Sequence, residues 1–319
     1  MAVFVEDWQT QYASPYLVQG DEEGAPQTAL TEDGDQLLSH AGKRSEVKHD
    51  RMAFVDGVRR GEAILYQHEP VTGKVAQGVA GSHACGAVIA DGELRPFFTD
   101  EQVQRLVIWG SGLTGEIPPV KGGWQWLSRS IDDSSPEAPL AELQQRMRHR
   151  EGLLAERLCA EGHLVIIDGP LSYVRSRDLP VVGYVKTHSR QLLSADNHIK
   201  IPRLRPGERT SLFRLGKDRY SCYLRLTLPT DISGPWAGIV RMEVPQSAGL
   251  REAIDVVDRM AGILPRYAGV AYRDPRAPQN LQPVGALESH LRHLLGDRGL
   301  AYRAVREAVM ALTAREVKA

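Results

Sequence analysis

The chain has 319 residues, of which 42% are hydrophobic and 25% are charged, a composition typical of a folded, water-soluble protein rather than a disordered or fibrous one. It contains no run of about 18 apolar residues, and its first residues lack the basic start and apolar core of a signal peptide, so we expect a cytoplasmic protein outside any membrane. The three cysteines are widely spaced, which argues against a disulfide framework or a zinc site.

The formal net charge of -1 hides an uneven distribution of charge. Residues 1–40 carry eight acids and no lysine or arginine, whereas residues 171–225 carry twelve bases against four acids. Arginine predominates among these bases, and its donors suit phosphate groups. The basic segment therefore indicates either contact with a nucleic-acid backbone or a solvated basic surface. Arg175, Arg190 and Arg209 are the candidate contacts from it.

We divide the chain into three parts. Residues 1–45 are acidic and rich in glycine, proline and polar residues, which predicts a partly ordered arm. Residues 46–298 hold the main domain, and residues 299–319 predict a C-terminal helix.

Strand patterns begin at Met52. Residues 52–58 and 62–67 predict two strands joined by a tight turn near Arg60 and Gly61, and residues 78–90 predict a third strand. Residues 100–105 resemble the start of a helix. Successive strands with short connections predict an antiparallel meander.

A helix is predicted to begin at Ser134, where serine, Pro136 and Glu137 form a good N-terminus. An apolar stripe follows at helical spacing, and Glu151 falls inside it. A carboxylate on the buried face of a helix requires a partner. That partner is either a metal ion or a salt bridge to Arg148 or Arg150.

The next strand, residues 164–168, ends in Asp168, which Gly169 follows, and a similar pair, Asp56 and Gly57, lies at the end of the first strand. An Asp-Gly pair after a strand indicates either an ordinary turn or a carboxylate site. If Asp56, Glu151 and Asp168 converge, three oxygen donors without Cys or His favour Mg²⁺ or Mn²⁺. Such ions support phosphodiester hydrolysis. The later strands and helices, at 179–186, 212–215, 220–228, 236–244, 247–264, 283–295 and 300–312, predict a mixed sheet with helices on its faces.

The series Phe54-Val55-Asp56-Gly57-Val58, then residues 164–173, then Gly183-Tyr184-Val185-Lys186-Thr187 resembles the NurA family of nucleases. The resemblance implies an RNase H-like α/β fold, in which the first strands are antiparallel, the later ones are parallel, and helices flank the sheet. It also implies Mn²⁺ (or Mg²⁺), action on DNA ends in repair, a homodimer, and a HerA-like hexameric ATPase as partner. The chain lacks a Gly-x-x-x-x-Gly-Lys-Ser/Thr loop, so any ATP-driven step needs such a partner.

Carried over by position, the resemblance makes Asp56 and Asp168 metal ligands and Glu151 the helix carboxylate. It places Tyr173 near the site and makes Lys186 a phosphate contact.

The sequence departs from the family pattern near its C-terminal end. The family has a histidine where this chain has Val284 or Gly285. Glu288, one helical turn on, is the candidate fourth ligand, ahead of His290 and His293. Val58 and Pro170 also stand where the family usually has serine. The alternative function is therefore a DNA-binding or scaffold subunit that keeps the fold but has weak catalysis.

Overall fold

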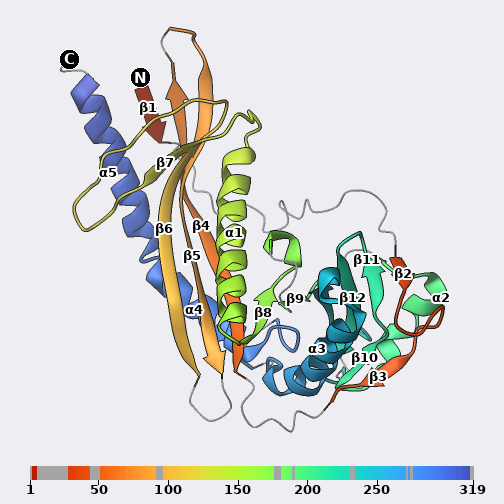
Figure 1. The fold of residues 1–319 in the computed structure, drawn as a ribbon. Helices are drawn as coiled ribbons and strands as arrows, with labels where there is room; N and C mark the ends of the chain where they lie inside the picture. The colour runs from red at the N-terminus through yellow and green to blue at the C-terminus, as the bar shows by residue number, and fades with distance from the viewer. Residues whose placement is uncertain are drawn as a thin grey trace.

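A computed structural model gives the structure of the chain and describes residues 2–5, 28–43, 51–69, 71–90, 96–175, 181–188, 191–229, 234–270, 272–273 and 276–316. Three long strands dominate it: β4 (Met52–His68), β5 (Val75–Ala90) and β6 (Phe97–Trp109). They form an antiparallel meander that runs along much of the length of the molecule (Figure 1).

Parallel strands continue the sheet on the other side of β4. β8 (Leu164–Asp168) lies parallel to β4, and β9 (Val182–Val185) lies parallel to β8. The order β6-β5-β4-β8-β9, with its first three strands antiparallel and the next two parallel, is that of an RNase H-like fold. The predicted fold class is confirmed.

Shorter strands complete the sheet. β13 (Ile239–Pro245) runs antiparallel to β9, and β12 (Arg219–Arg225) follows it. The remaining strands lie at the edges: β1 (Ala2–Val5) on β4, β7 (Leu127–Ser130) on β6, β11 (Phe213–Leu215) on β12, β2 (Thr28–Leu30) on β11, and β10 (Glu208–Thr210) between β12 and β3 (Ser39–Ala41).

Two local predictions for the meander were wrong. Residues 52–68 form one strand, and the expected turn near Arg60 is a register shift against β5 between Gly61 and Ala63. Residues 100–105 belong to β6 rather than to a helix. In both places pairing with the neighbouring strand β5 resumes on either side of a register shift, which lies at Glu62 in β4 and at residues 100–101 in β6. This pairing overrides the local turn or helix preference. Asp91 and Gly92, a pair typical of a hairpin turn, lie outside the described residues.

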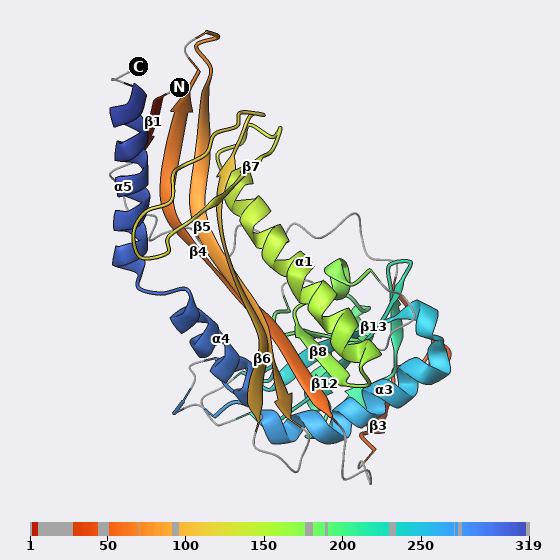
Figure 2. The same ribbon diagram turned by 60° about the vertical axis from the view of Figure 1, so that its left-hand side comes forward.

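Helices cover both faces of the sheet, as Figure 2 shows for α1 and α4 on either side of the meander. α1 (Ala138–Ala160) packs on one face, against Val55 and Ile167. α3 (Leu250–Ile263) and α4 (Gln282–Leu294) pack on the other face, against Phe54 and Ile166. α5 (Arg298–Glu316) contacts β1 and β4. The shorter helices are α2 (Ala195–His198), η1 (Leu171–Tyr173), η2 (Ile201–Arg203), η3 (Gln246–Ala248) and η4 (Leu264–Tyr267).

Strand alternation then positions the site. Side chains two residues apart point to the same face, so Asp56 shares the α4 face with Phe54, and Asp168 shares it with Ile166. None of the helices in the described ranges is long and apolar enough to cross a membrane.

Candidate metal centre

Asp56 and Asp168 lie side by side because β4 and β8 are paired in parallel. Phe54 is paired with Ile166 and Val55 with Ile167, so the next residues on the two strands come together. Asp168 is the last residue of β8, but Asp56 lies within β4, which continues for another twelve residues to His68. The prediction that both aspartates end a strand is therefore wrong for Asp56, although the predicted proximity is found.

The third member of this group comes from α4. One carboxylate oxygen each from Asp56, Asp168 and Glu288 lies within 4.8 Å of the other two. Asp56 and Glu288 are 4% and 7% exposed, so their charges are largely shielded from water. The structure thus brings together the two predicted aspartates and the proposed fourth ligand.

Glu151 lies on the opposite face of the sheet and is not a member of this oxygen cluster. Its Oε2 accepts a hydrogen bond from Arg148 Nη1 at 2.9 Å, and its Oε1 is buried without a partner among the described residues. The carboxylate is packed against Gly57 of β4. Of the alternatives open from sequence, the structure shows the salt bridge to Arg148.

Arg148 also holds the end of β8. Its Nη1 donates to the main-chain oxygen of Asp168 at 2.6 Å. Gly169 follows with a φ of 131°, and a Cβ there would lie 3.1 Å from Arg148 Nη1. The positive φ favours glycine, and the nearby guanidinium leaves little room for a side chain, which explains the Asp-Gly pair at this position.

Two further cations contact the oxygen cluster. Lys186, directly after β9, places its Nζ 2.6 Å from Asp168 Oδ2 and 2.8 Å from Asn280 Oδ1. Arg276 donates to both oxygens of Glu288, at 2.8 and 2.5 Å. Sequence reasoning found Lys186 but missed Arg276 and Asn280, since neither residue carries a local signal that links it to Asp56 or Asp168.

Burial and like charges shape the protonation of these groups. Burial raises the pKa of Asp56 well above its ordinary value, and the charges of Asp168 and Glu151 raise it further. Burial also raises the pKa of Glu151, against the opposing effect of Arg148. A carboxylate that is costly to ionise among other carboxylates is stabilised by a nearby cation.

The donors of this cluster fit a hard divalent cation. All three are carboxylate oxygens, the ligand type that Mg²⁺ and Mn²⁺ prefer. Asp56 Oδ2 is buried and has no hydrogen-bond partner in the part of the chain that the structure describes. An unsatisfied, buried anionic oxygen is expensive, and a bound cation would satisfy it.

The predicted nucleic-acid contacts divide into several groups. Tyr173 is half-buried at the end of η1, shortly after Asp168 in the chain, and Arg175 is exposed. Lys186 lies in the candidate centre itself. Arg190 lies outside the described residues.

Arg209 is a correction to the sequence prediction. Its side chain is 1% exposed, so it cannot contact nucleic acid. Its guanidinium instead donates to both oxygens of Glu32, at 2.7 and 2.8 Å, and to Asp258 Oδ1 at 2.7 Å. Burial with complete charge pairing identifies Arg209 as a structural residue.

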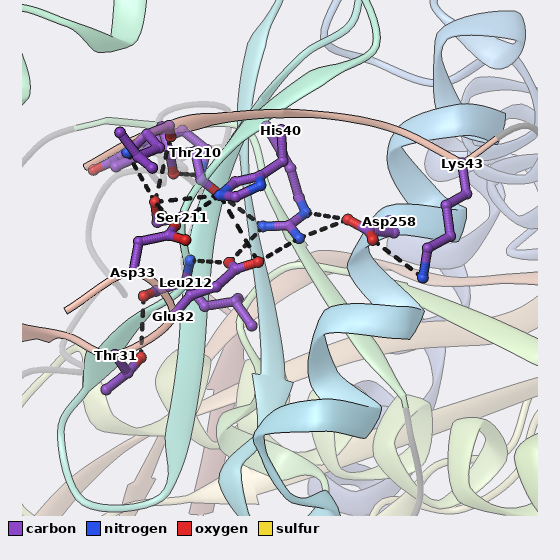
Figure 3. A network of polar contacts seen from close by, with 12 residues as sticks. Thr31, Glu32, Asp33, His40, Lys43, Thr210, Ser211, Leu212 and Asp258 are labelled. Carbon is purple, nitrogen blue, oxygen red and sulfur yellow. Dashed lines mark hydrogen bonds and ion pairs between the residues drawn. The ribbon is translucent and has the colours of Figure 1, made fainter. Parts of the chain in front are cut away.

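A second group of potential metal ligands, Glu32, Asp33 and His40, lies beside Ser211 and Leu212 (Figure 3). Asp33 Oδ2 accepts from Ser211 Oγ at 2.5 Å and lies 2.7 Å from His40 Nε2. Glu32 Oε2 also accepts from the Leu212 main-chain nitrogen. Internal partners thus satisfy these carboxylates, and the network joins residues 31–43 to the sheet.

The strand order and the buried carboxylates on β4, β8 and α4 define an RNase H-like protein with an acidic, metal-compatible site. A family model described as NurA domain matches residues 36–284, which is most of the chain. The chain therefore belongs to the NurA family, a family of nucleases. A comparison with curated proteins found no match.

Proposed function

We propose that this protein is a divalent-metal-dependent deoxyribonuclease that hydrolyses phosphodiester bonds at DNA ends. The observation that carries the proposal is the convergence of oxygen atoms from Asp56, Asp168 and Glu288 within 4.8 Å. Family membership supports the nuclease class, and the all-oxygen donor set supports Mn²⁺ or Mg²⁺.

The residues would share the work as follows. Asp56, Asp168 and Glu288 would hold the ion, which when bound supplies Lewis-acid stabilisation of the phosphoryl oxygens. Lys186 lies beside Asp168 and would offer its ammonium group to a phosphate oxygen. Arg148 would fix the end of β8 through the Asp168 main-chain oxygen and thereby hold the Asp168 carboxylate in place.

Assembly is part of the same proposal. A homodimer working with a HerA-like hexameric ATPase would combine cleavage with movement along DNA. The absence of a phosphate-binding loop from the sequence supports this division of labour, because the chain has no motif of that kind for ATP.

The test uses the purified full chain and end-labelled single-stranded DNA, duplex DNA and RNA, each with Mn²⁺, Mg²⁺ or EDTA. We expect Mn²⁺-dependent cleavage of DNA, and we expect Asp56→Asn and Asp168→Asn to lower its rate by at least about a hundredfold. Asp132→Asn is the control, because Asp132 is an exposed aspartate outside the cluster. Unchanged cleavage by both cluster variants would refute the site, and DNA binding without any turnover would favour the scaffold function.

A further inference from the structure

Glu288 is already held by a cation of the protein itself. Both of its carboxylate oxygens accept hydrogen bonds from Arg276, at 2.8 and 2.5 Å. The Glu288 side chain is 10% exposed, whereas the Arg276 side chain is 48% exposed. A buried carboxylate is therefore neutralised by a guanidinium that reaches it from the surface.

The same carboxylate belongs to the candidate metal centre. Glu288 offers one oxygen to the group that it forms with Asp56 and Asp168. A two-pronged arginine contact directs donors to both oxygens of a carboxylate. A divalent ion bound among the three carboxylates must therefore share Glu288 with Arg276 or displace it, and the two cations repel each other.

We propose that Arg276 is a resident counter-ion that holds Glu288 in the metal-free protein, lowers the affinity for divalent metal, and leaves Glu288 when the metal binds. This inference rests on the proposed metal centre. It assigns to Arg276 a positioning role, because it acts through Glu288.

Two other nearby cations each bond two groups of the protein. Lys186 bonds Asn280 as well as Asp168. Arg148 bonds both Glu151 and the main chain of Asp168. Arg276, being half exposed, can exchange its carboxylate partner for water at small cost.

Arg292 provides a matched comparison. It is on the same helix as Glu288 and lies 3.8 Å from Glu288 Oε2, with a side chain that is 66% exposed. It carries the same charge as Arg276 but lacks the two-pronged contact. Comparing variants that lack either Arg276 or Arg292 distinguishes the effect of the specific Arg276–Glu288 contact from that of losing one positive charge near the site.

The experiment measures Mn²⁺ binding to the full chain without DNA, by the electron paramagnetic resonance signal of free Mn²⁺. We expect Arg276→Gln to bind Mn²⁺ about tenfold more tightly than the wild type, and Arg292→Gln to stay within about twofold of it. Melting temperatures with EDTA and with Mn²⁺ give a second readout. Arg276→Gln should melt lower than the wild type in EDTA and gain more on addition of Mn²⁺.

A double variant tests whether Arg276 acts through Glu288. The pair Arg276→Gln and Glu288→Gln should bind Mn²⁺ no more tightly than Glu288→Gln alone, since residue 288 then carries no charge for which Arg276 and the metal compete. An additive gain in the double variant would overturn the inference.

The remaining outcomes distinguish the two proposals. If Asp56→Asn leaves Mn²⁺ binding unchanged, the metal centre itself is wrong. If binding requires Asp56 but Arg276→Gln leaves the affinity unchanged or weaker, the counter-ion role is overturned while the metal centre stands. An equal gain in Arg276→Gln and Arg292→Gln would also overturn the specific role of Arg276.

Discussion

The carboxylate of Glu151 on α1 lies directly against Gly57 on β4. A Cβ at residue 57 would overlap both Glu151 Oε1 and Met147 Cγ. Gly57 is in the middle of β4, paired with Cys85, and glycine inside a strand marks a close approach of this kind. Gly57 thus allows α1 to place the Glu151 carboxylate against β4, next to the backbone of Asp56.

Gly57→Ala should therefore destabilise the protein by about 1–3 kcal/mol, because an added methyl group forces α1 away from β4. Urea denaturation monitored by circular dichroism measures the change. Gly61→Ala on the same strand is the control, since its nearest neighbour would be Leu140 Cδ1 at 3.7 Å, an ordinary contact. Equal losses in both variants would show that strand propensity, rather than the Glu151 contact, sets the effect.

The buried Asp56 should make the metal-free protein less stable as the pH rises. Burial and the neighbouring charges of Asp168 and Glu151 raise its pKa in the folded protein well above the ordinary 3.8. The folded state then holds the proton more tightly than the unfolded state, so its stabilising contribution is complete below about pH 3.8 and is lost as the pH rises through the raised pKa.

Asp56→Asn removes this titration. In EDTA, the variant should be more stable than the wild type at neutral pH by about 1–3 kcal/mol, and the difference should widen from about pH 4 upward. Denaturation curves over a series of pH values measure it. A difference that stays constant with pH would contradict the assignment.

Arg148 and Glu151 should depend on each other. Removing the guanidinium by Arg148→Met leaves the Glu151 carboxylate buried and unpaired, which should cost about 3–5 kcal/mol. Adding Glu151→Gln removes that charge and should recover part of the loss, since the coupling between contacting residues is not additive. Thermal and urea denaturation of the two single variants and the double variant measure the coupling. Simple additivity would contradict the pairing.

Arg209 should affect stability rather than DNA affinity. Arg209→Met leaves Glu32 and Asp258 without their buried partner, at a cost of about 3–5 kcal/mol. The folded variant should keep the salt dependence of DNA binding, because a residue that contacts no phosphate releases no counter-ion. Arg203→Met, at an exposed position, is the stability control. If Arg209→Met, but not Arg203→Met, lowered the dependence of DNA affinity on salt concentration, Arg209 would be a DNA contact after all.

Much of the central sheet could be predicted because its strands carry their own signal. The apolar runs before Asp56 and Asp168 end in polar residues, and α1 shows its apolar stripe with Glu151 inside it. The errors arose where a neighbouring strand decided the conformation. Residues 100–105 look helical in isolation, yet residues 102–105 pair with β5 and the stretch becomes part of a sheet.

The candidate centre was only partly predictable for a related reason. Asp56 and Asp168 belong to strands whose parallel register could be expected from the fold, whereas Arg276 and Asn280 come from a segment that lacks any pattern of its own. Arg209 was misassigned because a cluster of arginines in sequence does not distinguish exposed residues from buried ones.

The sequence by itself determined the fold class and the acids, since hydrophobic periodicity and strand-bound aspartates are local features of the chain. Only the tertiary structure decided which acid joins Asp56 and Asp168. Packing of α4 on one face of the sheet and α1 on the other puts Glu288 into the oxygen cluster and leaves Glu151 behind Gly57 with Arg148. Which acid joins the cluster depends on which face of the sheet each helix covers. Local sequence patterns do not specify this, because the residues that meet are more than a hundred positions apart in the chain.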